Sequence, residues 1–238
     1  MSIRCESLNI AFDHHVFLEP TSLTIEKNAV VLLLGPSGSG KTTFFNIICC
    51  LMPKLSNRTK IYWFDYPVED IKKANKERYK YISMIYSHFY FLQSLNVQDN
   101  IKLPAVFSKQ PSNQIKKQLD KLYDILSFDG DMKETLSIKN LARRSIGSLS
   151  NGQKEIVGIA RAFMNNAPFI FADELLRSYN RDAEIKIWEK LFSPDLGIGI
   201  NKGFFMITHK DHLKEDPRIN HVYSIVNKKL KDIKDEQI

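Results

Sequence analysis

The sequence of 238 residues lacks several features that define common classes of protein. No stretch approaches the ~18–20 consecutive apolar residues of a membrane-spanning helix, so we expect no segment to cross a bilayer. The segment Met1–Glu6 has no apolar core of the kind found in signal peptides. There are only three cysteines, Cys5, Cys49 and Cys50, and their spacing is not that of metal ligands. We therefore expect reduced, buried cysteines in a cytoplasmic protein.

Acidic residues are the minority among the charged ones, and the formal net charge is +7. Lysine and arginine crowd residues 72–80 and residues 228–234. Such clusters are typical of chains that bind nucleic acid or an anionic membrane face. The alternative is an ordinary solvated surface. That alternative is favoured because Glu69, Asp70 and Glu77 are interspersed with the first cluster.

Residues 35–43 form a glycine-rich motif that matches G-x-x-x-x-G-K-[ST], the phosphate-binding P-loop, without a mismatch. The preceding apolar run Val30–Leu34 predicts a buried strand, and residues from Thr42 onward have helical spacing. Backbone amides of such a loop and the following helix N-terminus bind phosphate oxygens. Lys41 is predicted to contact the outer phosphates of a nucleotide, and Thr42 to ligate Mg²⁺. The predicted nucleotide-binding residues are Gly35, Pro36, Ser37, Gly38, Ser39, Gly40, Lys41, Thr42 and Thr43.

A second chemical motif, Asp173-Glu174, follows the apolar run Ile170–Ala172. An apolar strand that ends in two acids is where a P-loop nucleotide hydrolase needs them. Asp173 is predicted to hold Mg²⁺, directly or through water, and Glu174 to polarise the water that attacks the γ-phosphate. On its own, the pair is more simply read as exposed carboxylates at a strand end. The upstream P-loop favours the catalytic interpretation.

Strand and helix patterns alternate along most of the chain, which indicates a doubly wound α/β core. Residues 97–143 differ because they have helical spacing, and they predict a helical insertion between two α/β portions. We expect one domain over residues 1–238, with a helical subdomain at about residues 88–160. Residues 69–80 predict a helix or a charged loop, and the charged end, residues 227–238, is expected to be frayed.

Residues 149–153, with the sequence LSNGQ, place a serine and a glycine at the start of a predicted helix. A hydroxyl together with N-terminal helix amides is a second geometry for binding phosphate. One chain therefore carries two anion sites that are far apart in sequence. This arrangement makes sense if the second site serves a partner's nucleotide. The residues of this second site are Ser150, Asn151, Gly152 and Gln153.

With these motifs the sequence resembles the ATP-binding-cassette (ABC) ATPases over about residues 3–225. The motif order is that of the family: P-loop, helical insertion, LSNGQ, Asp-Glu strand and then a histidine, His209. The resemblance implies a P-loop NTPase core of ABC ATPase type with an N-terminal antiparallel β subdomain and an α-helical insertion. It also implies that His209 acts in catalysis with Glu174, that Phe12 stacks on adenine, and that ATP and Mg²⁺ are bound.

The chain departs from the family pattern at several positions. Ser87 stands where the family has a glutamine that touches Mg²⁺ and the attacking water, and a serine side chain does not reach as far unless a water fills the gap. We retain Ser87 as a candidate metal residue. Asn151 replaces a glycine, Asn180 replaces an aspartate that crosses the dimer interface, and Ile156 replaces an arginine. Two accounts stay open: a divergent but working ATPase, or a weakly hydrolysing cassette that binds ATP and gates a partner.

The resemblance implies a cytosolic ATP-binding subunit that is peripheral on the inner face of the cell membrane through a separate permease. Two cassettes are expected to sandwich ATP head to tail, with the P-loop of one chain facing Ser150 of the other. A homodimer is the default, and a heterodimer is the alternative. A groove near Ser87 and the helical insertion is expected to receive a short helix of the permease. Residues 34–48 and 95–104 resemble cassettes of macrolide export and lipoprotein release, which favours export or the extrusion of lipoprotein or peptide.

A different class of function is an ATP-dependent factor that acts on nucleic acid or on ribosomes, and the charge of +7 supports it. Members of the family in that class usually carry two cassettes in tandem or a long coiled coil. The 238 residues hold neither, so no direct nucleic-acid partner is expected. A GTPase or kinase of the P-loop type conflicts with the LSNGQ motif and with His209.

Overall fold

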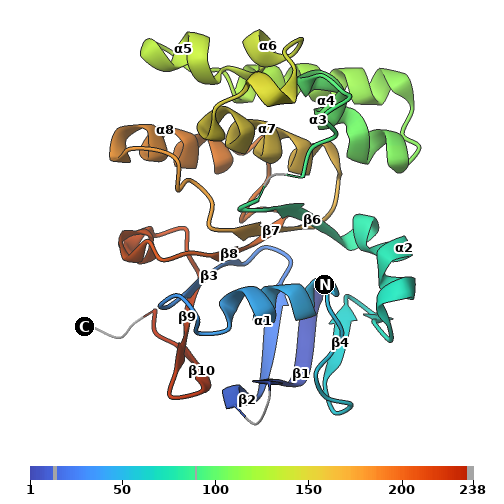
Figure 1. The fold of residues 1–238 in the computed structure, drawn as a ribbon, viewed down its shortest axis with the longest axis vertical. Coiled ribbons are helices and arrows are strands. Elements are labelled where there is room, and N and C mark those ends of the chain that lie inside the picture. Colours follow the sequence, from blue (N-terminus) through green and yellow to red (C-terminus); the bar gives the residue numbers. More distant parts are fainter. Residues whose placement is uncertain (13–14, 89, 235–238) are drawn as a thin grey trace.

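The apolar run before the P-loop forms strand β3 (Val30–Leu34) inside a six-stranded sheet of order β10-β9-β3-β8-β7-β6. We describe the fold from a computed structural model, which covers residues 1–12, 15–88 and 90–234 (Figure 1). The sheet is parallel except at its β10 edge. Its other strands are β6 (Ile82–Ile85), β7 (Phe169–Asp173), β8 (Gly203–Ile207), β9 (His221–Val226) and β10 (Lys229–Asp232).

The charged C-terminal segment is more ordered than its composition suggests. We expected fraying over residues 227–238, and this was wrong for residues 229–232, which form β10 in an antiparallel pair with β9. Leu230 packs against the core, and Nδ1 of His221 lies 2.7 Å from Oδ2 of Asp232. Strand pairing thus orders a segment whose polar side chains predict disorder, while residues 235–238 lie outside the described residues.

A second, antiparallel sheet of order β2-β1-β4-β5 is built mainly from the N-terminal part of the chain. Its alternating pattern buries Ile3, Cys5 and Ile25 on one face, as expected for a sheet with one face against a core. The N-terminal antiparallel β subdomain is therefore confirmed. The strands are β1 (Ser2–Phe12), β2 (His15–Glu26), β4 (Lys60–Trp63) and β5 (Tyr66–Pro67).

Helices cover both faces of the six-stranded sheet, and Figure 1 shows α1 on one side and α7 with α8 on the other. Side-chain oxygens of Asp70, Asn96, Ser150 and Asn180 cap the N-termini of α2, α3, α7 and α8, each by accepting a backbone N–H three residues further on. The helices are α1 (Lys41–Ile48), α2 (Ile71–Tyr81), α3 (Val97–Phe107), α4 (Ser112–Ile125), α5 (Asp131–Leu136), α6 (Ile138–Leu141), α7 (Asn151–Met164) and α8 (Arg181–Leu191), with short 3₁₀ turns at Ile146–Ser148 and Asp211–Glu215.

Two hydrophobic cores meet at the central sheet. Val30, Leu32 and Leu34 of β3 point into a core shared with the helical layer α3–α8. Val31 and Leu33 point into the other core, which is shared with α1 and the antiparallel sheet. This two-sided burial explains why β3 has a continuous apolar sequence, and it confirms the predicted α/β core.

The structure also bears on the three cysteines and on the lack of long apolar runs. Cys5, Cys49 and Cys50 are buried and unpaired, and burial raises the pKa of the Cys5 and Cys50 thiols to about 12, so these thiols are inert. Within residues 1–12, 15–88 and 90–234, no helix combines the length and the apolar character needed to cross a bilayer.

Candidate functional site

The glycine-rich loop joins the end of β3 to the start of α1, as the motif predicts. Gly35, Gly38 and Gly40 have φ values of +143°, +80° and +91°, which side-chain-bearing residues rarely adopt. These values let the backbone curl between strand and helix, so that loop amides and the start of α1 can face an anion. The Lys41 side chain folds back, and its Nζ donates to the carbonyls of Gly35 and Pro36 at 2.7 Å each.

The two predicted acids lie close to Lys41. Asp173 is the last residue of β7, and the N–H of Glu174 donates to the Ile207 carbonyl of β8 at 2.9 Å. Burial lowers the pKa of Lys41, while the negative charges of Glu174 and Asp173 act in the opposite direction. The carboxyl ends of parallel strands thus bring a phosphate-binding lysine and two carboxylates to one edge of the sheet, where α/β folds bind ligands.

The histidine of the last motif lies beside the second acid. His209 follows β8, and its Nδ1 is 3.6 Å from Oε1 of Glu174. Its side chain is largely exposed, so it remains accessible to a ligand at this edge of the sheet. The structure therefore brings the two predicted catalytic residues together.

Ser87 lies in the same site even though its side chain is short. It follows β6, and its hydroxyl donates to Oδ2 of Asp173 at 2.8 Å. Burial raises the pKa of Asp173, and the hydrogen bond from Ser87 opposes that shift. The serine thus stabilises the charged form of the carboxylate that is predicted to hold the metal.

The predicted adenine-stacking residue, Phe12, ends β1 and is 40% exposed. Its ring meets Phe17 edge to face, with 6.2 Å between ring centroids. Phe17 reaches the P-loop, because a Cβ added to Gly40 would lie 3.5 Å from the Phe17 Cβ. Our sequence reasoning missed Phe17. The antiparallel pairing of β1 with β2 could have indicated it, because Ala11 pairs with Val16, so the neighbours Phe12 and Phe17 lie near each other.

The LSNGQ motif begins α7 with a capping box. The Ser150 hydroxyl accepts from the Gln153 N–H at 3.2 Å, and Gln153 Oε1 accepts from the Ser150 N–H at 3.0 Å. Asn151 is exposed in the first turn, and Ile156 is fully buried. Figure 1 shows α7 in the helical layer and α1 on the opposite side of the sheet, so the two predicted anion sites occupy separate parts of one chain.

A close packing contact explains the glycine of this motif. A Cβ added to Gly152 would lie 3.1 Å from the ring of Tyr179, and the Tyr179 hydroxyl donates to the Gly152 carbonyl. Tyr179 precedes Asn180, whose side chain caps α8 by accepting from the Ala183 N–H at 3.0 Å. Asn180 therefore has a structural role in the chain itself, and Tyr179 links the LSNGQ helix to the segment after Glu174.

The oxygen atoms at the sheet edge suit magnesium in the presence of a nucleotide. Among the described residues, no three His, Cys, Asp or Glu side chains form a ready-made metal cage. Mg²⁺ does not require one, because it keeps several waters and usually binds one or two carboxylates plus substrate phosphates. Asp173 supplies a carboxylate, Ser87 contacts that carboxylate, and Thr42 is an exposed residue in the first turn of α1. The donor set fits a nucleotide-bound Mg²⁺.

Comparisons with known proteins agree with this geometry. The ABC transporter family model matches residues 18–177. The macrolide export ATP-binding/permease protein MacB of Neisseria gonorrhoeae is 33% identical over 180 residues, which are 72% of this chain and 26% of that protein. The ABC transporter ATP-binding protein MG065 of Mycoplasma genitalium is 32% identical over 157 residues, which are 66% of this chain and 31% of that protein. The chain thus spans only about a quarter to a third of the length of these relatives.

A solved structure shares the fold over nearly the whole chain. The dimeric ATP-binding cassette MJ0796, in a post-hydrolysis state with ADP and Pi, aligns with a TM-score of 0.78 at 21% identity. The alignment covers 97% of this chain and 98% of that one. At this identity the likeness shows the fold alone.

Proposed function

This chain belongs to the ABC transporter family, and we propose that it is an ATP-binding cassette that hydrolyses ATP as a head-to-tail dimer to drive a separate membrane permease. The observation that carries the proposal is the convergence of Lys41, Asp173, Glu174 and His209 at one edge of the parallel sheet. No other cluster in the described residues joins a phosphate-binding loop to two carboxylates.

The residues at this edge have separable roles. When ATP binds, the loop amides and Lys41 hold phosphate oxygens, and Lys41 exchanges its carbonyl partners Gly35 and Pro36 for them. Mg²⁺ held near Thr42 and Asp173 would neutralise charge on the outer phosphates. Glu174 orients the attacking water and accepts its proton, and His209 donates to the γ-phosphate. Phe12 supports the adenine ring.

The separation of the two anion sites supports the dimer. Ser150 lies at the start of α7, in the helical layer, whereas the P-loop precedes α1 on the other side of the sheet (Figure 1). The Ser150 hydroxyl and the N-terminal end of α7 would bind an anion that is not the chain's own nucleotide. In a head-to-tail pair, Ser150 would face the γ-phosphate on the partner's P-loop. A homodimer is the default, and a heterodimer would let a partner supply the glycine that Asn151 replaces.

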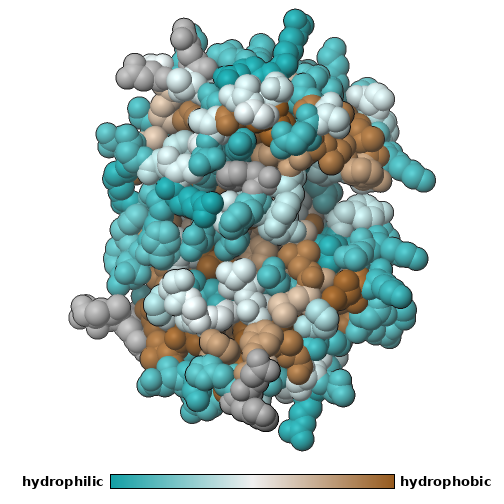
Figure 2. Space-filling view, viewed as in Figure 1, coloured by the Kyte–Doolittle hydropathy of each residue, from teal (hydrophilic) through white to brown (hydrophobic). Residues whose placement is uncertain are grey.

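A groove beside the site supports a permease partner. A cavity of about 280 Å³ lies between α2, β6 and the helices α3 and α7, and Tyr86, Pro104 and Arg161 are among its lining residues. Large apolar side chains stay exposed on these elements, including Tyr79 at 45% and Phe107 at 77%. Figure 2 shows hydrophobic residues gathered at the end of the helical layer where α3 and α4 lie. Such a surface suits an apolar helix of a membrane partner.

The basic segment gives less support to a nucleic-acid partner. Lys73 pairs with Glu69, and Lys80 pairs with Glu77, so part of the positive charge of α2 is neutralised. These exposed pairs are typical of a solvated helix face. We propose that the chain lies at the inner face of the cell membrane through a permease, and that the direction is export or extrusion, because the relative MacB is named as a macrolide export protein.

The test is phosphate release from ATP by the chain together with the permease subunit that co-purifies with it. We expect turnover that requires Mg²⁺ and that the permease stimulates. If the chain binds ATP but releases no phosphate in any complex, the gating-cassette alternative replaces hydrolysis. Binding to RNA or DNA that salt weakens, without a membrane partner, would instead indicate the nucleic-acid alternative.

A further inference from the structure

The segment between β7 and α8 contains residues in an uncommon backbone conformation. Glu174 has φ +49° and Leu176 has φ +67°, and both values lie in the left-handed region that non-glycine residues seldom adopt. Leu176 is fully buried, so its two backbone polar groups need partners within the protein. Such a conformation persists only where the surroundings hold it in place.

Both backbone groups of Leu176 have charged partners. Its N–H donates to the buried Glu155 carboxylate of α7, and its carbonyl accepts from Lys210 Nζ at 2.9 Å. Lys210 also pairs with the buried Glu184 of α8. We call these two bonds to the Leu176 backbone the Leu176 clamp. Lys210 is the residue after His209, so the clamp connects α7 and the segment that carries His209 to the backbone of Leu176. Leu176 is therefore held from two sides.

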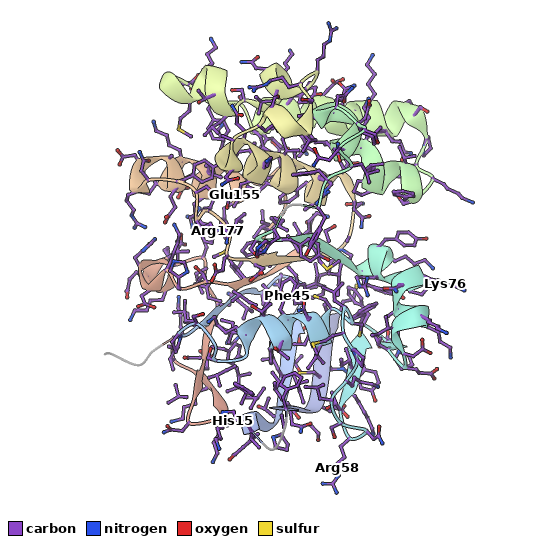
Figure 3. All side chains as sticks on the ribbon, in the orientation of Figure 1. His15, Phe45, Arg58, Lys76, Glu155 and Arg177 are labelled. Atoms are coloured by element: carbon purple, nitrogen blue, oxygen red, sulfur yellow. The ribbon has the colours of Figure 1, made fainter. Side chains whose placement is uncertain are left out.

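The Leu176 clamp fixes the backbone beside Arg177, whose side chain reaches the loop that follows β6. Arg177 Nη2 donates to the Ser87 carbonyl at 2.8 Å, and its Nη1 lies 4.0 Å from Oε2 of Glu174. Ser87 in turn donates to Asp173 through its hydroxyl. Figure 3 shows Arg177 and Glu155 in the region between α7 and the sheet. One guanidinium thus connects the Ser87 loop with the acid that orients the water.

We infer that Arg177 is a positioning residue of the ATPase site, which holds the Ser87 loop against the carboxyl end of β7 through the Ser87 backbone. The inference rests on the proposed ATPase function. The Ser87 hydroxyl gives this loop one bond to Asp173, and Arg177 adds a second connection through the Ser87 backbone. A planar guanidinium suits this task because its fork can reach a carbonyl and a carboxylate together.

The charge of Arg177 also matches its surroundings. Burial raises the pKa of Asp173 and of Glu155, and the positive charge of Arg177 counters that rise at both carboxylates. Arg177 places Ser87 where its hydroxyl meets the Asp173 carboxylate, because it holds the backbone carbonyl of the same residue. Removal of the guanidinium loosens the loop and weakens the metal site together, without removing any residue that contacts phosphate.

The experiment compares Arg177→Ala and Arg177→Lys with the parent and with Arg58→Ala. Arg58 is exposed and lies at the far end of the molecule in Figure 3, so it controls for the loss of one positive charge. Hydrogen–deuterium exchange of residues 82–88 is measured on the nucleotide-free chain. Mg²⁺ titrations of ATP hydrolysis are measured on the same proteins, with the Michaelis constant for ATP determined at saturating Mg²⁺.

Arg177→Ala is expected to speed exchange at residues 82–88 and to raise the Mg²⁺ concentration for half-maximal turnover roughly tenfold, as the loss of an outer partner of a metal site does. Arg177→Lys should show smaller changes in the exchange rate and in the Mg²⁺ dependence, and Arg58→Ala should change neither quantity. Unchanged exchange and unchanged Mg²⁺ dependence in Arg177→Ala would overturn the inference. A fall in kcat alone, with unchanged exchange, would also overturn it and would indicate direct contact with phosphate. A parent that never hydrolyses ATP contradicts the proposed function, whereas the exchange measurement still decides the role of Arg177.

Discussion

The hydroxyl of Ser87 donates a hydrogen bond to Oδ2 of Asp173 at 2.8 Å, although 86 positions separate the two residues in sequence. The bond joins the loop after β6 to the end of the neighbouring strand β7. Ser87 therefore does not merely lack the reach of the glutamine found at this position in the family. Its hydroxyl makes its own hydrogen bond to the carboxylate proposed to hold Mg²⁺.

Replacement of Ser87 by glutamine is expected to lower, or leave unchanged, the basal rate of ATP hydrolysis. Glutamine has a longer side chain that could reach metal and water, but it loses the short hydroxyl bond to Asp173 and must displace the present arrangement. The measurement is phosphate release by parent and Ser87→Gln, each with and without the permease. A clear increase in basal rate would show that Ser87 is a simple loss of function.

The P-loop lysine should supply much of the phosphate affinity. Lys41→Ala removes a charge-assisted contact of about 1.5–3 kcal/mol, so ATP should bind roughly tenfold or more weakly. Lys76→Ala is the matched control, because Lys76 lies exposed on α2, far from the loop (Figure 3). Calorimetric titration with ATP checks the affinity, and circular dichroism checks the fold. Parent-like binding and hydrolysis by Lys41→Ala would refute the P-loop assignment.

The aromatic pair at the end of the first hairpin should support the adenine ring. Phe12→Ala is expected to weaken ATP binding by ~1–3 kcal/mol, by analogy with base stacking. Phe17→Ala should also weaken it, because the Phe17 ring contacts Phe12 and its Cβ lies beside Gly40 of the P-loop. Stacking provides no hydrogen bond specific to the base, so GTP should bind nearly as well as ATP. A preference for ATP above a hundredfold in competition binding would contradict this account.

The buried Glu155 predicts a dependence of stability on pH. Burial raises its folded pKa above the unfolded value of about 4.3. The folded chain therefore binds more protons than the unfolded chain between the two pKa values, and its stability falls as pH rises through that window. Glu155→Gln keeps an acceptor for the Leu176 N–H but has no charge, so it should melt at a higher temperature than the parent at about pH 8 and lose this advantage at about pH 4.

Thermal unfolding of parent and Glu155→Gln across that pH range checks the sign. Glu69→Gln is the control, because the Glu69 side chain is exposed and pairs with Lys73 on the surface. If the parent is as stable as Glu155→Gln at the higher pH, ionised Glu155 carries no penalty and the explanation is wrong.

The local parts of the fold could be predicted from sequence because their signals are local. The continuous apolar run Val30–Leu34, the glycines of the P-loop and the capping box at Ser150 each specify their own geometry within a few residues. The contacts around Leu176 could not be predicted in this way. They depend on Glu155 and Lys210, which come from different parts of the chain. They also depend on the positive φ of Leu176, which the presence of a leucine does not predict.

The same distinction explains the other differences. Residues 229–232 are mostly charged, which predicted a frayed end, but they pair with β9. The prediction failed because strand pairing depends on a neighbouring strand, which composition does not indicate. Phe17 was missed because it comes to lie beside Gly40 only when β2 packs near the P-loop. Arg177 was overlooked because its partner Ser87 lies 90 residues away in sequence.

The most direct test of the account is the molar mass of Glu174→Gln in ATP and Mg²⁺, measured by light scattering during gel filtration. The variant keeps Lys41 and the P-loop but lacks the carboxylate that accepts a proton from water, so ATP should persist and hold two chains together. The account predicts that the mass doubles from 27.5 kDa with ATP and returns with ADP, and that Ser150→Ala in the same background weakens the pair. A Glu174→Gln chain that binds ATP but stays monomeric, even with its permease, would contradict the head-to-tail sandwich.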